Sequence, residues 1–348
     1  MQKDKTAVAE RKMARYETEK QVAHKEKDSP LSRLCFLVPL AGICCFLWGS
    51  ATPAIKIGYQ MFHVDTSDTV SILLFAGIRF FLAGFLVILF RALADKKWTL
   101  PPKGAGRALL TLALCQTVLQ YFFFYIGLAN ASGVHGAILT GTGVFFSMLV
   151  AALLFHYERL NARKLLGCAL GFAGIIIINL TGNATTGLFH FSILGEGFVL
   201  AAQFFYALSA AFMKKFGKQF DVVILSGYQF MLGGILLAVI GFIGGGRIGI
   251  GASKGAYALL LYLGCISAVA YTLWGVLLKY NPVSRVSIFG FMNPVFGVLL
   301  SALFLGESGQ AFSGQALAAL ILVCFGIFVV NRAPENRKMY AAAAEARR

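Results

Sequence analysis

A long stretch without a charged side chain constrains this chain more than any other feature. The residues from Ala108 to Tyr157 include no Asp, Glu, Lys or Arg. Soluble domains usually contain about 25% charged residues, whereas this whole chain contains 13% and is 58% hydrophobic. The sequence therefore predicts an all-α polytopic membrane protein, and it argues against a soluble enzyme, a disordered protein and a fibrous repeat.

The uncharged stretch is too long for one membrane span of about 20 residues, and it is long enough for two. Asn130 to Gly133 supply a turn between these two spans, with Ser132 as the expected N-cap of the second. A β-barrel would need alternating strands of about 10 residues, and the uninterrupted apolar runs argue against one. The ten predicted transmembrane helices cover 36–58, 71–90, 107–127, 132–155, 164–181, 194–213, 222–243, 256–277, 283–305 and 313–331.

Basic residues are divided unevenly between the two sides of this arrangement. One alternating set of segments holds 27 of the 31 Lys and Arg residues, and the other set holds two, Arg247 and Lys254. The rich set comprises the tail 1–33, the segments 91–107, 156–164, 214–221 and 279–285, and Arg332 together with the tail 333–348. The positive-inside rule then places both termini in the cytoplasm of a cell-membrane protein. The net charge of +16 is explained by topology, so we expect no nucleic-acid partner.

The two halves of the chain repeat each other. Residues 75–84 match 225–234 at an offset of 150, and Trp48 and Lys56 have the same separation as Tyr206 and Lys214. Further matches join 152–158 to 301–307, at an offset of 149, and 174–179 to 326–331. Each repeat, 34–182 and 193–332, contains five spans, and this odd number inverts the second copy in the membrane. Two inverted five-helix repeats are typical of secondary transporters.

Several short motifs follow one another in a specific order across the two halves. They are Trp48-Gly49-Ser50, Arg79-Phe80, Tyr157-Glu158-Arg159-Leu160, Asn293-Pro294 and Leu305-Gly306-Glu307. Over residues 36–331 the chain resembles the EamA-type branch of the drug/metabolite transporter superfamily. The resemblance implies a ten-helix basket with a cavity lined by spans 1, 3, 4, 6, 8 and 9, and transport of amino acids or similar metabolites. Phe145 stands where the second repeat has Pro294, which leaves open whether span 4 is broken.

Polar and aromatic side chains recur at helical spacing on the spans that the resemblance assigns to the cavity. Such walls suit a zwitterionic or amphipathic solute, although the same residues can instead form hydrogen bonds between helices. The expected substrate-binding residues are Trp48, Thr52, Arg79, Gln116, Gln120, Tyr121, Tyr125, Gln203, Tyr206, Tyr271 and Trp274.

Arg79 lies about eight residues inside its span, roughly 12 Å deep. It could bind a substrate carboxylate, or it could bond backbone carbonyls, and Gln229 at the equivalent position favours the second reading. Lys56 is expected to snorkel to the outer interface, and His135 is expected to be a boundary residue.

Carboxylates are confined to tails, loops and span ends, as at Glu158, Glu196 and Glu307. Ion-coupled carriers commonly place a carboxylate near the midplane, so we expect facilitative transport, or coupling through His135 or substrate exchange. No residue spacing suggests a metal site, a cofactor or an intramembrane catalytic constellation.

The leading prediction is a secondary carrier that moves a small organic metabolite outward by alternating access around a midplane cavity. A non-transporting scaffold or accessory subunit is the alternative. The expected partners are the solute and the lipid bilayer. Gly167 and Gly171 predict either close packing inside the chain or a homodimer contact.

Overall fold

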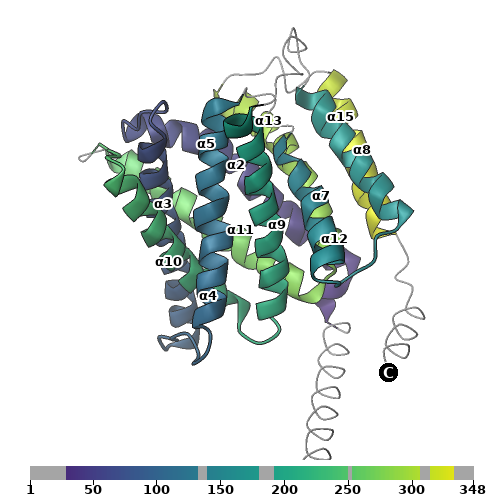
Figure 1. Cartoon of the computed structure of the whole chain (residues 1–348), viewed down its shortest axis with the longest axis horizontal. Helices are drawn as coiled ribbons and strands as arrows, with labels where there is room; N and C mark the ends of the chain where they lie inside the picture. Colours follow the sequence, from purple (N-terminus) through teal and green to yellow (C-terminus); the bar gives the residue numbers. More distant parts are fainter. Residues whose placement is uncertain (1–28, 132–138, 180–191, 250–252, 306–313, 333–348) are drawn as a thin grey trace, which may run out of the picture.

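The computed structural model describes residues 29–131, 139–179, 192–249, 253–305 and 314–332, and all secondary structure in these ranges is helical (Figure 1). Ser132, His135 and Glu307 lie outside the described residues. Each of the ten predicted spans corresponds to one helix or to consecutive helical segments. After the short η1 (Pro30–Ser32) these are α2 (Leu34–Met61); α3 (Thr69–Asp95); α4 (Gly106–Leu112), η2 (Ala113–Leu119) and α5 (Gln120–Asn130); α7 (Thr142–Leu149) and η3 (Val150–Leu154); α8 (Ala162–Asn179); η4 (Ile193–Gly197) and α9 (Phe198–Phe216); α10 (Val222–Ile243); α11 (Lys254–Tyr280); α12 (Val283–Ser287), η5 (Ile288–Phe291) and α13 (Met292–Leu305); and α15 (Gly314–Asn331).

The outer faces of these helices are apolar. Among the described residues, six helical stretches are long and apolar enough to cross a membrane, for example Thr69–Asp95 and Val222–Ile243. Large apolar side chains remain uncovered on them, such as Phe242 at 73% and Ile243 at 79% exposure. So many uncovered apolar side chains on one surface are typical of lipid contact. The chain is a multi-pass membrane protein, as predicted.

Equivalent helices of the two repeats begin in the same way. The Asp68 carboxylate accepts a hydrogen bond from the Val70 amide at 3.2 Å and thereby caps α3. The Asp221 carboxylate accepts one from the Val223 amide at 2.7 Å and caps α10. Side-chain oxygens at this position satisfy amides that have no partner inside the helix, so the ends of α3 and α10 follow from the local sequence.

The packing of the helices is unchanged when the two repeats are exchanged. Helix α3 packs against its equivalent α10, and α8 packs against its equivalent α15. Helix α2 packs against α11 and α13, whereas its equivalent α9 packs against α5 and α7, the counterparts of those two helices. This reciprocity is the arrangement that two inverted five-helix repeats predict.

Glycines set the close approach of α3 and α10. A Cβ added at Gly77 would lie 2.3 Å from the backbone nitrogen of Ala238, and one at Gly227 would lie 2.4 Å from Cδ1 of Ile88. The two contacts are equivalent, because Gly77 and Gly227, and likewise Ile88 and Ala238, are separated by the offset of 150 that the sequence shows. The repeat is therefore visible at the level of single contacts.

The glycine pair of span 5 packs inside the chain. A Cβ at Gly167 would meet Val330 and the Gly326 carbonyl of α15, and a Cβ at Gly171 would meet the Phe291 ring. The packing interpretation of this pair is confirmed, and a homodimer contact stays a prediction.

Span 4 and its equivalent, span 9, are both interrupted. Pro294 is the third residue of α13, directly after the 3₁₀ segment η5. Proline lacks an amide hydrogen and its ring clashes with the preceding turn, which favours a break there. In the first repeat a turn at Gly141 precedes α7 although Phe145 replaces the proline. The interruption of span 4 therefore does not depend on proline.

The described segments rich in basic residues, 91–107, 156–164, 214–221 and 279–285, gather at one end of the bundle, the lower end in Figure 1, which we call the basic end. The Asn281 side chain donates to the Leu31 carbonyl at 3.0 Å, and Arg285 Nε donates to Asn331 Oδ1 at 3.3 Å. The start of α2, the junction of α11 and α12, and the end of α15 are therefore neighbours. The structure shows this clustering, and the compartment that the basic end faces remains a prediction.

Candidate functional site

Aromatic side chains from five helices meet where the two repeats join. We call Trp48, Phe80, Tyr121, Phe230, Tyr271 and Trp274 the aromatic cluster. The Trp48 ring lies 5.0 Å from both Tyr271 and Trp274, between ring centroids and in edge-to-face geometry. Such rings give rigid walls with a negative face and a positive edge.

The centre of the aromatic cluster consists of residues related by the repeat. Phe80 and Phe230 stack with centroids 5.5 Å apart and an interplanar angle of 13°. The hydroxyls of Tyr121 and Tyr271 are hydrogen-bonded at 2.5 Å. Each pair is separated by 150 residues, so the axis that relates the repeats passes through the cluster.

Arg79 places a positive charge beside this cluster. Its side chain is 4% exposed, and its guanidinium carbon lies 4.6 Å from the centroid of the Phe80 ring. Within the described residues no carboxylate lies within ion-pair distance of Arg79, and its Nε has no hydrogen-bond partner. The expectation that Arg79 bonds backbone carbonyls is therefore not met in this part of the chain. An arginine at the centre of a span costs about 2.5–3.5 kcal/mol, so an unpaired one indicates a functional role.

The equivalent residue of the second repeat is fully paired. Gln229 is 0% exposed, accepts a hydrogen bond from Thr117 Oγ1 at 3.2 Å and donates one to Gln116 Oε1 at 3.1 Å. Buried amides are ordinarily satisfied in this way. Gln229 therefore joins α10 to η2 through hydrogen bonds, whereas the Arg79 guanidinium is available to bind a solute.

Other polar atoms around the aromatic cluster also lack partners. The indole nitrogens of Trp48 and Trp274 and the Oε1 of Gln120 are buried without a hydrogen bond in the described structure. Buried polar atoms are rarely left unsatisfied without a ligand, water or functional reason. Donors and an acceptor of this kind suit a solute with both a carboxylate and an ammonium group.

A small cavity continues from the aromatic cluster toward the basic end. Its size is that of about one water molecule. It is lined by Gln116, Tyr206, Ser209, Ala210, Met213, Tyr271, Trp274, Gly275 and Leu278. This cavity therefore has no room for an organic solute in this conformation.

The structure brings most of the predicted site residues together. Trp48, Tyr121, Tyr271 and Trp274 belong to the aromatic cluster, and Tyr125 packs on Tyr121 at 5.7 Å between centroids. Gln116, already paired with Gln229, lines the cavity with Tyr206, and Arg79 joins the cluster through Phe80.

Gln203 differs from this pattern. The Oε1 of Gln203 faces Gly143 on α7, 2.4 Å from an added Cβ. Thr52 belongs to α2, and its side chain is outside the described part. Sequence reasoning missed Phe80, Phe230 and Ser209 as site residues. The offset of 150 could have pointed to the first two.

Comparison with known proteins identifies the family. The model of the EamA-like transporter family matches residues 36–180 and 193–332. The chain belongs to this family. It is a membrane transporter of the EamA type.

Named relatives agree with that assignment. The chain is 28% identical over 306 residues to a "probable amino-acid metabolite efflux pump" of Salmonella typhimurium, covering 83% of this chain and 93% of that protein. It is 28% identical over 274 residues to the "uncharacterized transporter YvbV" of Bacillus subtilis, covering 77% and 85%. A protein of known crystal structure shares the fold with a TM-score of 0.66 at 17% identity, covering 85% of this chain and 96% of that one.

Proposed function

We propose that this transporter exports small zwitterionic carboxylates of the amino-acid type across the cell membrane. The solute would bind beside the aromatic cluster, and the two repeats would expose that site alternately to each side. The basic end would face the cytoplasm, as the positive-inside rule requires.

One observation carries the proposal: Arg79 is a buried guanidinium that has no counter-ion among the residues that the structure describes. A carboxylate would supply the missing charge and accept hydrogen bonds in the bidentate geometry that arginine favours. The Gln120 Oε1, which has no hydrogen-bond partner in the described part of the chain, would accept a hydrogen bond from the solute's ammonium group. The names of the relatives from Salmonella typhimurium and Escherichia coli, "probable amino-acid metabolite efflux pump", support the same substrate class.

The proposed transport is exchange or facilitated diffusion. Glu158 lies in the loop after η3, and Glu196 lies in η4 at the start of span 6, so neither carboxylate is near the middle of a span. No acidic group among the described residues is therefore placed to carry a proton next to Arg79.

Counterflow in proteoliposomes tests this function. Vesicles containing the purified protein are loaded with one unlabelled amino acid, and entry of the same labelled solute is followed across a panel of amino acids, amines and sugars. We expect saturable exchange of zwitterions, and loss of this exchange in Arg79→Gln.

The matched control is Arg91→Gln, which makes the same substitution on the same helix at a half-exposed residue paired with Asp95. It should exchange like the unaltered protein. Exchange of amines or sugars but not of zwitterions would refute the substrate class. A folded protein that exchanges no solute would favour the scaffold alternative.

A further inference from the structure

The helices around the cavity form two bundles, which we call bundle A and bundle B. Bundle A consists of η2, α5, α7, η3 and α9, and bundle B consists of α2, α11, α12 and α13. Helix α9 packs closely on α5 and α7, and α2 packs closely on α11 and α13, whereas contacts between α9 and α11 and between α7 and α12 are fewer. The aromatic cluster and the cavity lie along the seam between the bundles.

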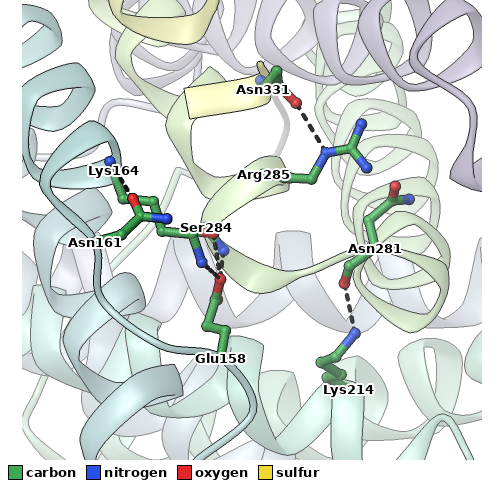
Figure 2. A network of polar contacts seen from close by, with 8 residues as sticks. All are labelled: Glu158, Asn161, Lys164, Lys214, Asn281, Ser284, Arg285 and Asn331. Carbon is green, nitrogen blue, oxygen red and sulfur yellow. Dashed lines mark hydrogen bonds and ion pairs between the residues drawn. The ribbon is translucent and has the colours of Figure 1, made fainter. Parts of the chain in front are cut away.

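Lys214 crosses this seam at the basic end. It lies near the end of α9 in bundle A, and its Nζ donates to the carbonyls of Leu278 at 2.8 Å and Asn281 at 2.5 Å, at the end of α11 in bundle B. Figure 2 shows the lysine pointing at the Asn281 carbonyl. The last carbonyls of a helix have no partner inside the helix and carry partial negative charge, so they attract an ammonium group.

Glu158 crosses the same seam from the end of span 4. Its carboxylate accepts a hydrogen bond from the Ser284 amide at 2.8 Å and one from the Ser284 hydroxyl, at the start of α12 in bundle B. It also forms an ion pair with Lys164 (Figure 2). The Glu158 side chain is buried, at 5% exposure of the residue. The two bonds to Ser284 hold this carboxylate, which follows η3 of bundle A in the chain, against the start of α12 in bundle B.

Both contacts lie between the cavity and the basic end. Ala210 lines the cavity and is one helical turn before Lys214 on α9, and Leu278 lines the cavity and is an acceptor of Lys214. Ser284 follows three residues after Asn281, the second acceptor of Lys214. A solute that moves from the cavity to this end would have to pass between the groups that these bonds join.

We propose that Lys214 and Glu158 form a gate that closes the cavity toward the basic end. The bonds involve charged groups and are stronger than neutral hydrogen bonds, yet each charged group can exchange its protein partner for water when the bundles separate. The gate is therefore a two-state contact of the kind that alternating access requires. This inference rests on the proposed function, because a carrier needs a gate and a scaffold does not.

Thiol labelling from one side tests the gate. Ser209, which lines the cavity and is 1% exposed, is changed to Cys. A membrane-impermeant maleimide is added to vesicles that expose only the basic end. Modification is measured at residue 209 by mass spectrometry, so the native cysteines can remain. Labelling should be slow when both gate residues are intact. It should be faster by roughly tenfold or more with Lys214→Met and Glu158→Ala combined, since each removes a charge-assisted contact.

Matched controls separate opening from unfolding. Lys215→Met and Asp95→Ala remove exposed charges at the same end and should leave the labelling rate unchanged. Ser226→Cys, which is 0% exposed and lies on α10, outside both bundles, should stay unreactive in the gate variants. Unchanged labelling at residue 209, or equal gains at residues 209 and 226, would overturn the gate.

The labelling needs no solute, so its failure can be told apart from failure of the proposed function. Faster labelling in the gate variants, together with no exchange of any amino acid by the unaltered protein, would contradict the substrate proposal and leave the gate supported. Amino-acid exchange together with unchanged labelling would contradict the gate alone.

Discussion

The two repeats share a backbone plan but treat one equivalent position in opposite ways. Arg79 of α3 is buried beside the Phe80 ring without an ion-pair partner in the described structure, whereas Gln229 of α10 bonds Gln116 and Thr117. The helices around them pack reciprocally, and their glycines meet across the α3–α10 contact at positions related by 150. At this pair of positions the two repeats therefore differ in side-chain chemistry, although the helices that carry them pack in equivalent ways.

That difference indicates a division of labour. A paired amide contributes to the packing of its helix, because its hydrogen bonds are satisfied by the protein. An unpaired guanidinium destabilises the helix that carries it and persists only where function requires it. We infer that the first repeat supplies the charge that binds the solute and that the second repeat supplies a rigid counterpart.

Replacing Arg79 by Gln makes the first repeat resemble the second. Of the variants proposed, it should have the largest effect on solute exchange. A hydrogen bond to a charged group contributes about 1.5–3 kcal/mol, so exchange should fall on the order of 10- to 100-fold. The thermal midpoint in detergent should stay equal or rise, because a buried unpaired charge is removed. Counterflow and thermal unfolding measure the two effects. A fall in both quantities would mean that Arg79 is structural.

Replacing Gln229 by Leu should have the reverse signature. The Gln116 amide oxygen and the Thr117 hydroxyl would lose their partner, and an unsatisfied buried polar group costs about 1–3 kcal/mol. We expect lower stability in denaturant titrations, with a KM for exchange within about threefold of the unaltered value, less than half a decade of affinity. Gln60→Leu, at an exposed residue of α2, is the control that should leave stability unchanged. A large change in KM without loss of stability would contradict the division of labour.

Gly77 and Gly227, which set the close approach of α3 and α10, offer a test with a smaller expected effect. Gly77→Ala would bring a Cβ within 2.3 Å of the Ala238 backbone nitrogen, which cannot move without shifting α10. We expect a loss of about 1–3 kcal/mol of stability, as for other overpacked sites. Gly227→Ala meets the flexible end of Ile88 instead, so the loss should be below that of Gly77→Ala. Unfolding titrations of both variants measure the order, and equal losses would show that Ile88 is as rigid as backbone.

The stacked rings should give the smallest effect. Phe80→Leu and Phe230→Leu both remove the stack, but only Phe80 also lies under the Arg79 guanidinium. The extra cost of Phe80→Leu should be about 0.5–1 kcal/mol, the range of modest cation–π contacts. It should vanish when Arg79 is already Gln. A cycle of the four proteins in unfolding titrations checks this, and an extra cost that survives without Arg79 would assign it to packing.

The fold was largely predictable from the sequence because its determinants are local or periodic. Apolar runs give the spans, Asp68 and Asp221 give helix starts, and the offset of 150 gives the repeat. Trp48, Tyr121, Tyr271 and Trp274 were found because helical spacing gathers the polar and aromatic side chains of each span on one face.

Contacts that join distant segments could not be predicted in this way. Lys214 was interpreted as a repeat marker and a loop charge, and Glu158 as part of a motif and a span-end acid. Their partners were not predicted because they are 64 and 126 residues away. Gln229 was taken as evidence that Arg79 is structural, but that inference assumed that equivalent positions have equivalent partners. The structure shows that Thr117 and Gln116 reach Gln229, and sequence spacing within α10 contains no sign of them.

The most direct test of the account measures the coupling between Arg79 and the carboxylate of the solute. The best exchanged amino acid and its uncharged carboxamide are each titrated by calorimetry into the unaltered protein and into Arg79→Gln. If the guanidinium binds the carboxylate, the substitution weakens the acid by about 10- to 100-fold and leaves the amide nearly unchanged. Equal weakening of the acid and the amide would contradict the account, because Arg79 would then act through the structure of the site and not through the charge of the solute.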